Sequence, residues 1–203
     1  AVTLAEAKRR GLKVHAWVNT SLLANLDALP NDPKHVYNKH PEWLAVPRPV
    51  ASQLYRMSPR DTRYKERIVE WSKANRAELE GIYTGPANPK VREHIYKIWM
   101  DVLKNYDVDG IHFDYVRLAS PDFDYSRTSL DRFRRWLEPK LSETERSQLR
   151  QDLKANPLAA ADGPRGALLP VLRQVPGAGA VRGLQRHDGA GVELLRHLRL
   201  PAA

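Results

Sequence analysis

The sequence predicts an α/β fold, and two segments carry most of that prediction. Residues 89–106 have apolar side chains at helical spacing, and residues 109–116 follow them with the alternation of a strand. Residues 12–19 form a second strand-like segment, in which Val14, Ala16 and Val18 face one way and the polar or aromatic residues face the other. A half-polar face is typical of strands that line a barrel. We therefore expect strands and helices that alternate as part of a barrel.

The first half of the chain predicts short elements around a long irregular stretch. Residues 4–10 are helical in pattern and Gly11 ends them, as a glycine after the last helical turn does. The strand at 12–19 follows. Residues 20–63 are rich in proline, so we expect a long loop, and loops of this length are usually functional. A helix is expected over 63–79 and an extended piece over 81–85.

The second half predicts better-marked helices. Asn88 and Pro89 are favourable residues for a helix start. We expect the apolar stripe of that helix to pack on the sheet: Val91, Ile95, Ile98, Trp99, Val102, Leu103 and Tyr106. After the strand at 109–116, residues 118–126 are expected to be a loop and 127–138 a helix. Ser142 and Glu145 form a capping box for a further helix.

The composition changes near residue 158. Residues 158–203 hold seven of the chain's eleven glycines and contain no Lys, Trp, Tyr, Phe, Met, Ile or Asn. We therefore assign residues 1–157 to the partial barrel domain. We interpret residues 158–203 as an anomalous Ala/Gly/Pro/Arg-rich tail. This tail is either non-native, for example through a frameshift, or disordered. A natural linker of the same composition is the alternative.

Overall composition indicates a soluble globular protein and excludes several classes. Hydrophobic residues make up 42% and charged residues 28% of the 203 residues. No apolar run approaches the ~20 residues of a membrane-spanning helix. The absence of cysteine excludes disulfides and thiolate metal sites. The net charge of +9 is spread along the chain, so we expect a solvated basic surface and no nucleic-acid partner.

The strand at 109–116 carries the strongest candidate for chemistry. Ile111 and Phe113 face one side, and His112 and Asp114 face the other. An inward Asp at the C-terminal end of a barrel strand lies where barrel enzymes keep their catalytic groups. We therefore predict Asp114 as the catalytic residue, oriented by His112 and Arg117. A structural carboxylate paired with Arg117 or with a loop amide is the alternative.

Three segments occur in an order and spacing typical of a known family. They are residues 11–19 (GLKVHAWVN), residues 40–44 (HPEWL), and residues 86–93 (PANPKVRE) continued by 106–117 (YDVDGIHFDYVR). Together they resemble the glycosyl hydrolase-like 10 family of bacterial envelope proteins. The resemblance implies a (β/α)₈ TIM-type barrel, and a parent protein that is exported or envelope-associated. No signal peptide is visible in residues 1–10.

The resemblance also implies the activity: a glycoside hydrolase that cleaves an envelope or cell-wall polysaccharide by carboxylate acid/base chemistry, without a cofactor. A non-catalytic polysaccharide-binding barrel is the alternative, and a nucleic-acid binder is a third interpretation that rests on charge alone. A complete barrel needs about 250 residues. We therefore expect this chain to be a partial barrel that is unstable or aggregating and hydrolytically inactive by itself, although its parent is an enzyme.

Polysaccharide-binding residues are expected on two strands and their loops, and His112 and Arg117 belong to this set. His15, Trp17 and Asn19 point inward on the first strand, where Trp17 can stack on a sugar ring or pack in the lumen. Trp43 and Tyr83 can line a glycan groove or pack within their loops. Tyr115 follows Asp114 and points outward unless the strand has ended there.

Glycoside cleavage usually needs a second carboxyl group. Glu80, Asp122 and Asp124 are candidates, each of which is also compatible with a surface position, and a later strand is a further source. Asp109 is expected to be a turn or capping residue. A metal site formed by His15, His112 and Asp114 is a minor alternative; we expect none.

Overall fold

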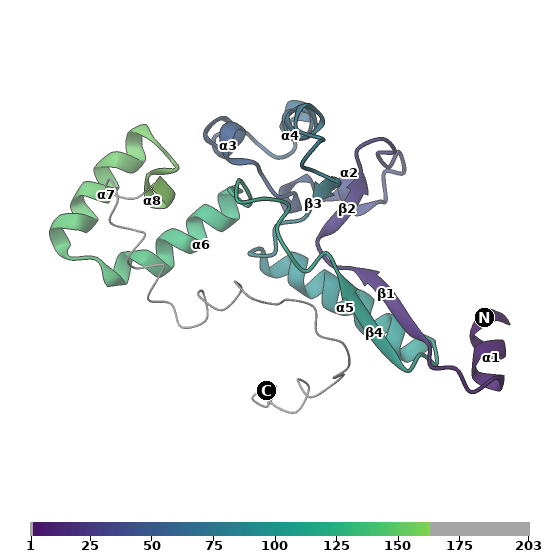
Figure 1. Ribbon diagram of the computed structural model, residues 1–203. Helices are drawn as coiled ribbons and strands as arrows, with labels where there is room; N and C mark the ends of the chain where they lie inside the picture. The colour runs from purple at the N-terminus through teal and green to yellow at the C-terminus, as the bar shows by residue number, and fades with distance from the viewer. Residues whose placement is uncertain (1, 163–203) are drawn as a thin grey trace. The chain divides into compact units, whose positions relative to one another are not determined.

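The computed structural model describes residues 2–162 and has a mixed α/β architecture with two small sheets (Figure 1). In chain order the elements are α1 (Val2–Arg9), β1 (His15–Asn19), β2 (Leu22–Asn25), α2 (Val36–Lys39), η1 (Pro41–Trp43), α3 (Arg48–Tyr55), α4 (Thr62–Ala74), β3 (Gly81–Tyr83), α5 (Pro89–Asn105), β4 (Gly110–Asp114), α6 (Arg127–Leu137), η2 (Glu138–Lys140), α7 (Glu143–Ala155) and α8 (Ala159–Asp162).

The predicted α/β unit is present. Strands β1 and β4 pair in parallel, with Ala16 opposite Ile111 and Asn19 opposite Asp114. Parallel strands need a crossover connection, and here it ends in α5, which runs alongside β4 (Figure 1). Phe113 of β4 contacts Trp99 of α5, with 4.4 Å between the ring centroids. In residues 2–162 these two strands pair only with each other, so the described part of the chain does not form a barrel.

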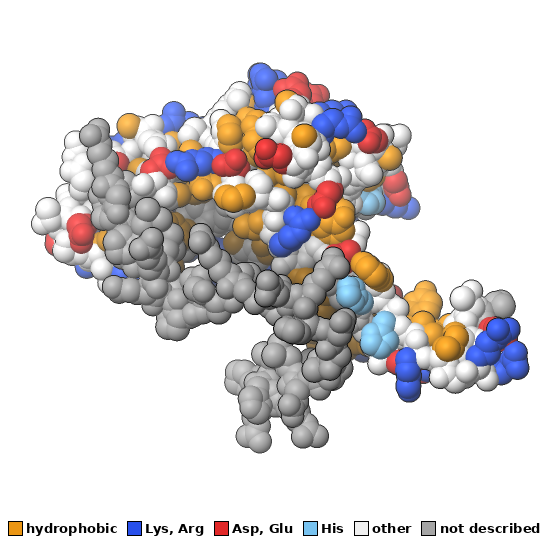
Figure 2. Space-filling view, viewed as in Figure 1, with side chains coloured by type: hydrophobic (Ala, Val, Ile, Leu, Met, Phe, Trp, Pro, Cys, Tyr) orange, Lys and Arg blue, Asp and Glu red, His pale blue; other side chains and the backbone are white. Residues whose placement is uncertain are grey.

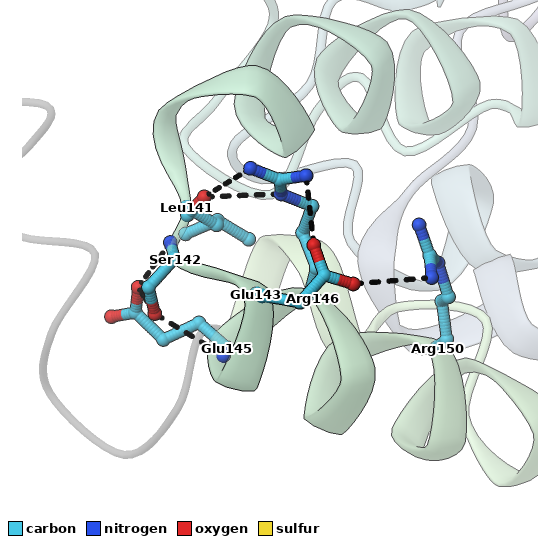
Figure 3. A network of polar contacts seen from close by, with 6 residues as sticks. All are labelled: Leu141, Ser142, Glu143, Glu145, Arg146 and Arg150. Atoms are coloured by element: carbon cyan, nitrogen blue, oxygen red, sulfur yellow. Dashed lines mark hydrogen bonds and ion pairs between the residues drawn. The ribbon is translucent and has the colours of Figure 1, made fainter.

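The residues predicted to end one helix and to begin two others are confirmed. Gly11 has a φ of +71°, the left-handed conformation in which glycine ends a helix without strain. The Asn88 side chain caps α5 by accepting from the Lys90 N–H at 3.0 Å. Figure 3 shows the start of α7, where Glu145 accepts from the Ser142 N–H at 2.8 Å and the capping box is complete.

The prediction of a long irregular loop over residues 20–63 is wrong. We call residues 20–88 the inserted segment, because they lie between β1 and α5. They contain β2, α2, η1, α3, α4 and β3. Three of the six prolines in the stretch, Pro41, Pro47 and Pro49, lie at the starts of η1 and α3, where proline is tolerated, and the other three lie in connecting loops and turns.

Most of the hydrophobic core lies in the inserted segment. Its buried apolar residues include Ala24, Leu26, Leu44, Val46, Leu54, Tyr64, Ile68, Ile82 and Tyr83. Strand β3 pairs antiparallel with β2, and Gly81 is opposite Asn25. A Cβ atom at Gly81 would lie 2.2 Å from the Ala24 carbonyl oxygen, so only glycine allows this close strand contact. The inserted segment therefore supplies much of the packing in the described chain.

Helix α5 differs in part from its prediction. Its apolar stripe was expected to pack on the sheet, yet Val91 is its buried member, while Ile98, Leu103 and Tyr106 are exposed. Two strands form a sheet too narrow to cover the apolar face of a helix of this length. The β1–α5–β4 unit therefore exposes large apolar side chains.

The start of the predicted tail lies within the packed structure. Leu158 and Ala160 are buried, and α8 lies against α6 and α7. Asp162 pairs with Arg48 at 2.5 Å and accepts from Asn156 at 2.9 Å. The remainder of the predicted tail, residues 163–203, lies outside the described residues.

Candidate active site on the β1–β4 strand pair

One face of the β1–β4 pair carries the predicted polar and aromatic residues. Trp17 lies opposite His112 in the register, and their ring centroids are 4.4 Å apart with the planes tilted by 35°. Asn19 lies opposite Asp114. Figure 2 shows histidine side chains on the surface of this region, with hydrophobic side chains beside them. The alternation predicted for both strands therefore brings Trp17, Asn19, His112 and Asp114 onto one face.

Asp114 is held by two hydrogen bonds, one on each carboxylate oxygen. The Trp17 indole Nε1–H donates to Oδ2 at 2.8 Å, and the Tyr115 backbone N–H donates to Oδ1 at 2.8 Å. The Trp17 side chain reaches across from β1, while its ring remains 70% exposed. A fixed carboxylate therefore lies at the end of β4 beside an aromatic ring that is open to solvent.

The backbone turns sharply directly after Asp114. Tyr115 has a φ of +51°, a conformation that costs a non-glycine residue about 1–3 kcal/mol. Two ladder-like bonds fix this turn to the end of β1: Thr20 N–H donates to the Asp114 carbonyl oxygen at 2.8 Å, and Ser21 N–H donates to that of Tyr115 at 3.3 Å. The strand ends at Asp114, so Tyr115 packs edge-on against Tyr83, with ring centroids 6.2 Å apart. Strained residues of this kind cluster at functional sites.

A second polar cluster joins the site through Tyr115. The Tyr83 hydroxyl donates to Glu80 Oε2 at 2.5 Å, and Arg117 Nη2 donates to the same oxygen at 2.9 Å. The Arg117 guanidinium also lies over the Tyr115 ring, 5.5 Å from its centroid. Burial raises the pKa of Tyr83, and its hydrogen bond to Glu80 adds to the shift, so the phenol remains a donor. Arg117 thus pairs with Glu80 and not with Asp114, whereas Asp114 accepts from a loop amide, the Tyr115 N–H, as the structural alternative allowed.

Two predicted glycan-contacting aromatics are buried. Tyr83 is 2% exposed and Trp43 is 8% exposed. The Trp43 ring stacks on His40 at 3.9 Å and lies 5.3 Å from His94. Trp43 and Tyr83 are therefore packed locally, as the alternative interpretation held. Neither residue offers an open ring face.

His15 also lies far from Asp114, which bears on the alternative of a metal site. His15 begins β1 and its ring lies over Gly110, at the opposite end of the strand pair from Asp114. Four residues of strand separate the two ends, about 13 Å. Within residues 2–162 no group of three or more His, Asp or Glu side chains is arranged to hold a metal ion. His15, His112 and Asp114 therefore do not form a ligand set.

Asp124, one candidate for the second carboxylate, has a structural role. Its Oδ1 accepts from the Val46 and Ser126 N–H groups at 2.9 Å, and its Oδ2 accepts from the Ser129 hydroxyl at 2.6 Å. Burial raises its pKa, and these hydrogen bonds oppose the shift. Asp124 joins the loop before α6 to the core of the inserted segment. Asp122 is exposed.

Asp109 joins the beginnings of β1 and β4. Its carboxylate accepts from the Val14 N–H at 2.9 Å and from Lys13 Nζ at 3.2 Å. The Val14 hydrogen bond, followed by the Lys13 contact, lowers the pKa of Asp109. Asp109 therefore joins the two strand starts, at the end of the pair away from Asp114, and does not have the helix-capping role that was one of the two expected for it.

Helices long and apolar enough to cross a membrane do not occur in the described part of the chain.

A profile of the family described as Glycosyl hydrolase-like 10 matches residues 1–150. The chain is also similar to the protein named Glycosyl hydrolase YngK of Bacillus subtilis (strain 168), with 24% identity over 170 residues. That similarity covers 76% of this chain and 27% of the relative, so the chain spans about a quarter of the relative's length. Because the family profile covers most of its length, the chain belongs to the glycosyl hydrolase-like 10 family.

Proposed function

We propose that this domain, within a complete (β/α)₈ barrel, is a glycoside hydrolase that cleaves an envelope or cell-wall polysaccharide, with Asp114 as a catalytic carboxylate. One observation carries the proposal: an open tryptophan ring and a fixed carboxylate lie together at the end of β4. Aromatic faces pack against the apolar faces of sugar rings, and carboxylates perform glycoside cleavage. Family membership supports the same activity. An exported or envelope-associated location belongs to this proposal.

The proton donor of the reaction comes from outside this cluster. Glu80 is the carboxylate linked to the site through Tyr83 and Tyr115, and it is engaged by the Tyr83 hydroxyl and the Arg117 guanidinium. Those contacts engage its oxygens as acceptors, so we assign Glu80 a part in ordering the loop after β4. We assign the donor role to a carboxylic acid on a further strand of the barrel.

A non-catalytic polysaccharide-binding barrel is the second candidate. It is favoured by the observation that the β1–β4 face presents one carboxylate together with an open aromatic ring. The same face would bind a glycan without turnover if no second carboxyl group lies within about 5–10 Å of Asp114.

The test compares wild type, Asp114→Asn and Asp122→Asn in protein produced from the complete gene. Release of reducing ends from bacterial cell-wall glycan, binding to the same insoluble glycan, and the thermal midpoint are measured for each. We expect Asp114→Asn to lower hydrolysis by about 10²- to 10⁴-fold with the midpoint nearly unchanged. Asp122→Asn, an exposed carboxylate change, should leave all three readouts unchanged.

Each other outcome decides between the candidates. Glycan binding without hydrolysis by the wild type would favour the binding barrel. Hydrolysis at the wild-type rate by Asp114→Asn would remove Asp114 from the mechanism. Neither binding nor hydrolysis of the glycan by the wild type would contradict both candidate functions.

A further inference from the structure

We propose that Trp17 is a positioning residue for Asp114, in addition to any contact its ring makes with a sugar. Its indole N–H holds the carboxylate oxygen Oδ2, so the same side chain that faces the glycan also orients the group that acts on it. This inference rests on the proposed function, because it assigns Trp17 a part in that reaction.

The contact is built by the strand register. Trp17 and Asp114 lie on neighbouring parallel strands and on the same face, with Asp114 two residues beyond the partner of Trp17. Contact with the His112 ring, 4.4 Å away, limits the rotation of the indole. The Nε1–H therefore points along the strand pair toward its C-terminal end, where it meets Asp114 at 2.8 Å.

The exposure of Trp17 separates positioning from folding stability. An indole on a residue that is 70% exposed can donate to water in the unfolded protein, and also in a folded variant that lacks the Asp114 carboxylate. The bond to Asp114 therefore contributes little net stability, since folding exchanges one hydrogen bond for another. What the bond fixes is the rotation of the carboxylate about its own side-chain axis.

Both oxygens of Asp114 act as acceptors. Tyr115 N–H engages Oδ1 and Trp17 Nε1–H engages Oδ2, and no other side chain in residues 2–162 donates to this carboxylate. His112 packs its ring on Trp17, and Arg117 is engaged by Glu80. A carboxylate held by two N–H donors is arranged as the accepting partner of a glycosidase pair and not as its proton donor. Trp17 is the side chain that holds the Asp114 carboxylate in this accepting arrangement.

The kinetic test uses Trp17→Phe in protein from the complete gene, because phenylalanine keeps an aromatic face and removes the N–H. We expect kcat to fall by about 10- to 100-fold, because the carboxylate loses its fixed orientation, while KM changes by less than about threefold. Trp17→Ala should lose kcat equally and raise KM further. Trp136→Phe, a change at a partly exposed tryptophan on α6, is the matched control and should change neither constant.

The second measurement needs no activity. In ¹⁵N-labelled protein from the complete gene, the hydrogen-exchange rate of the Trp17 indole N–H is compared with that of Trp136, in wild type and in Asp114→Ala. We expect slow exchange at Trp17 in the wild type and at least about tenfold faster exchange in Asp114→Ala, with Trp136 unchanged.

The two tests separate this inference from the proposed function. Absence of hydrolysis in the wild type overturns the proposed function, whatever the exchange rates show. Fast exchange at Trp17 in the wild type, or an unchanged kcat in Trp17→Phe, overturns the positioning role even where the wild type is fully active. A loss confined to KM would assign Trp17 to sugar stacking alone.

Discussion

The inserted segment and the β1–α5–β4 unit are built in opposite ways. In the inserted segment short strands and helices enclose fully buried side chains, with Leu44, Val46 and Ile68 in its core. In the β1–α5–β4 unit regular elements leave large apolar groups in solvent, including Leu103, which is 47% exposed, and Tyr106, which is 55% exposed. Packing is thus concentrated in the inserted segment, whereas the proposed catalytic groups lie on the β1–β4 pair.

The open β1–β4 face is compatible with the proposed function, because a carboxylate and a tryptophan ring that were to contact a polysaccharide would have to remain open. The inserted segment supports that face from beyond the strand ends: Tyr83 packs on Tyr115, and the end of β1 hydrogen-bonds to residues 114–115. Elements with low local stability often carry function, so we expect the β1–α5–β4 unit to be the less stable of the two regions.

The largest expected effect is a difference between the two regions in how much a leucine-to-alanine change lowers the free energy of unfolding. Leu44→Ala removes a fully buried side chain from the inserted segment and should lower the free energy of unfolding by about 2–5 kcal/mol. Leu103→Ala on α5 is the matched change at a half-exposed position and should cost less than about 1 kcal/mol. Urea denaturation of both variants provides the comparison. Equal costs would show that α5 is as well packed as the inserted segment.

Sequence patterns identified the β1–α5–β4 unit far better than the inserted segment. The start of α5 at Asn88 and Pro89, and the alternation of β4, are local signals. Strand β2 has four residues and η1 has three, too few for a periodic pattern to emerge. Proline was interpreted as a sign of irregular structure there, although Pro41 begins η1.

The candidate site could be predicted only in part. Alternation places Trp17, His112 and Asp114 on one face, and both strands could be recognised from sequence. The Trp17–Asp114 hydrogen bond joins residues 97 positions apart, and it depends on a register that no single strand encodes. Arg117 was expected near Asp114 because the two are close in sequence. The turn at Tyr115 instead directs Arg117 to Glu80.

A second stability effect concerns the link between the inserted segment and α6. Asp124→Ala leaves the N–H groups of Val46 and Ser126 without their acceptor and should cost about 2–4 kcal/mol. Because burial raises the pKa of Asp124 in the folded protein, its ionisation opposes folding. Relative to Asp124→Asn, wild type should therefore lose stability as pH rises from about 4 through the folded-state pKa. Denaturation at several pH values measures this trend, and a wild-type advantage that grows with pH would contradict it.

A third effect concerns association of the chain by itself. The exposed apolar residues of α5, together with the free edges of the β1–β4 pair in residues 2–162, favour contacts between copies. We expect the isolated chain to self-associate at micromolar concentration and to lack hydrolytic activity. A Leu103→Lys/Tyr106→Lys variant should associate less, as measured by light scattering. An active, monomeric wild-type chain would contradict the expectation.

The smallest effect concerns the beginning of the strand pair. The Val14 hydrogen bond and the Lys13 contact lower the pKa of Asp109, so its ionised form stabilises the folded chain. That contribution is present above the unfolded-state value of about 3.9 and is lost as pH falls through the folded-state pKa. Asp109→Asn should therefore be less stable than wild type at neutral pH, with the difference disappearing in acid. A pH-independent difference in thermal midpoint would assign the effect to other causes.

Amide hydrogen exchange, resolved by residue, tests the division between the two regions most directly. The N–H groups of Ala45, Thr84 and Gly85 bond within the core of the inserted segment, and those of β1 and β4 bond within the open strand pair. We predict that exchange at Ala45, Thr84 and Gly85 requires global unfolding, and that β1 and β4 exchange through local opening at lower free energy. Equal or greater protection of β1 and β4 would contradict the account, because stability would then reside in the strand pair that carries Asp114.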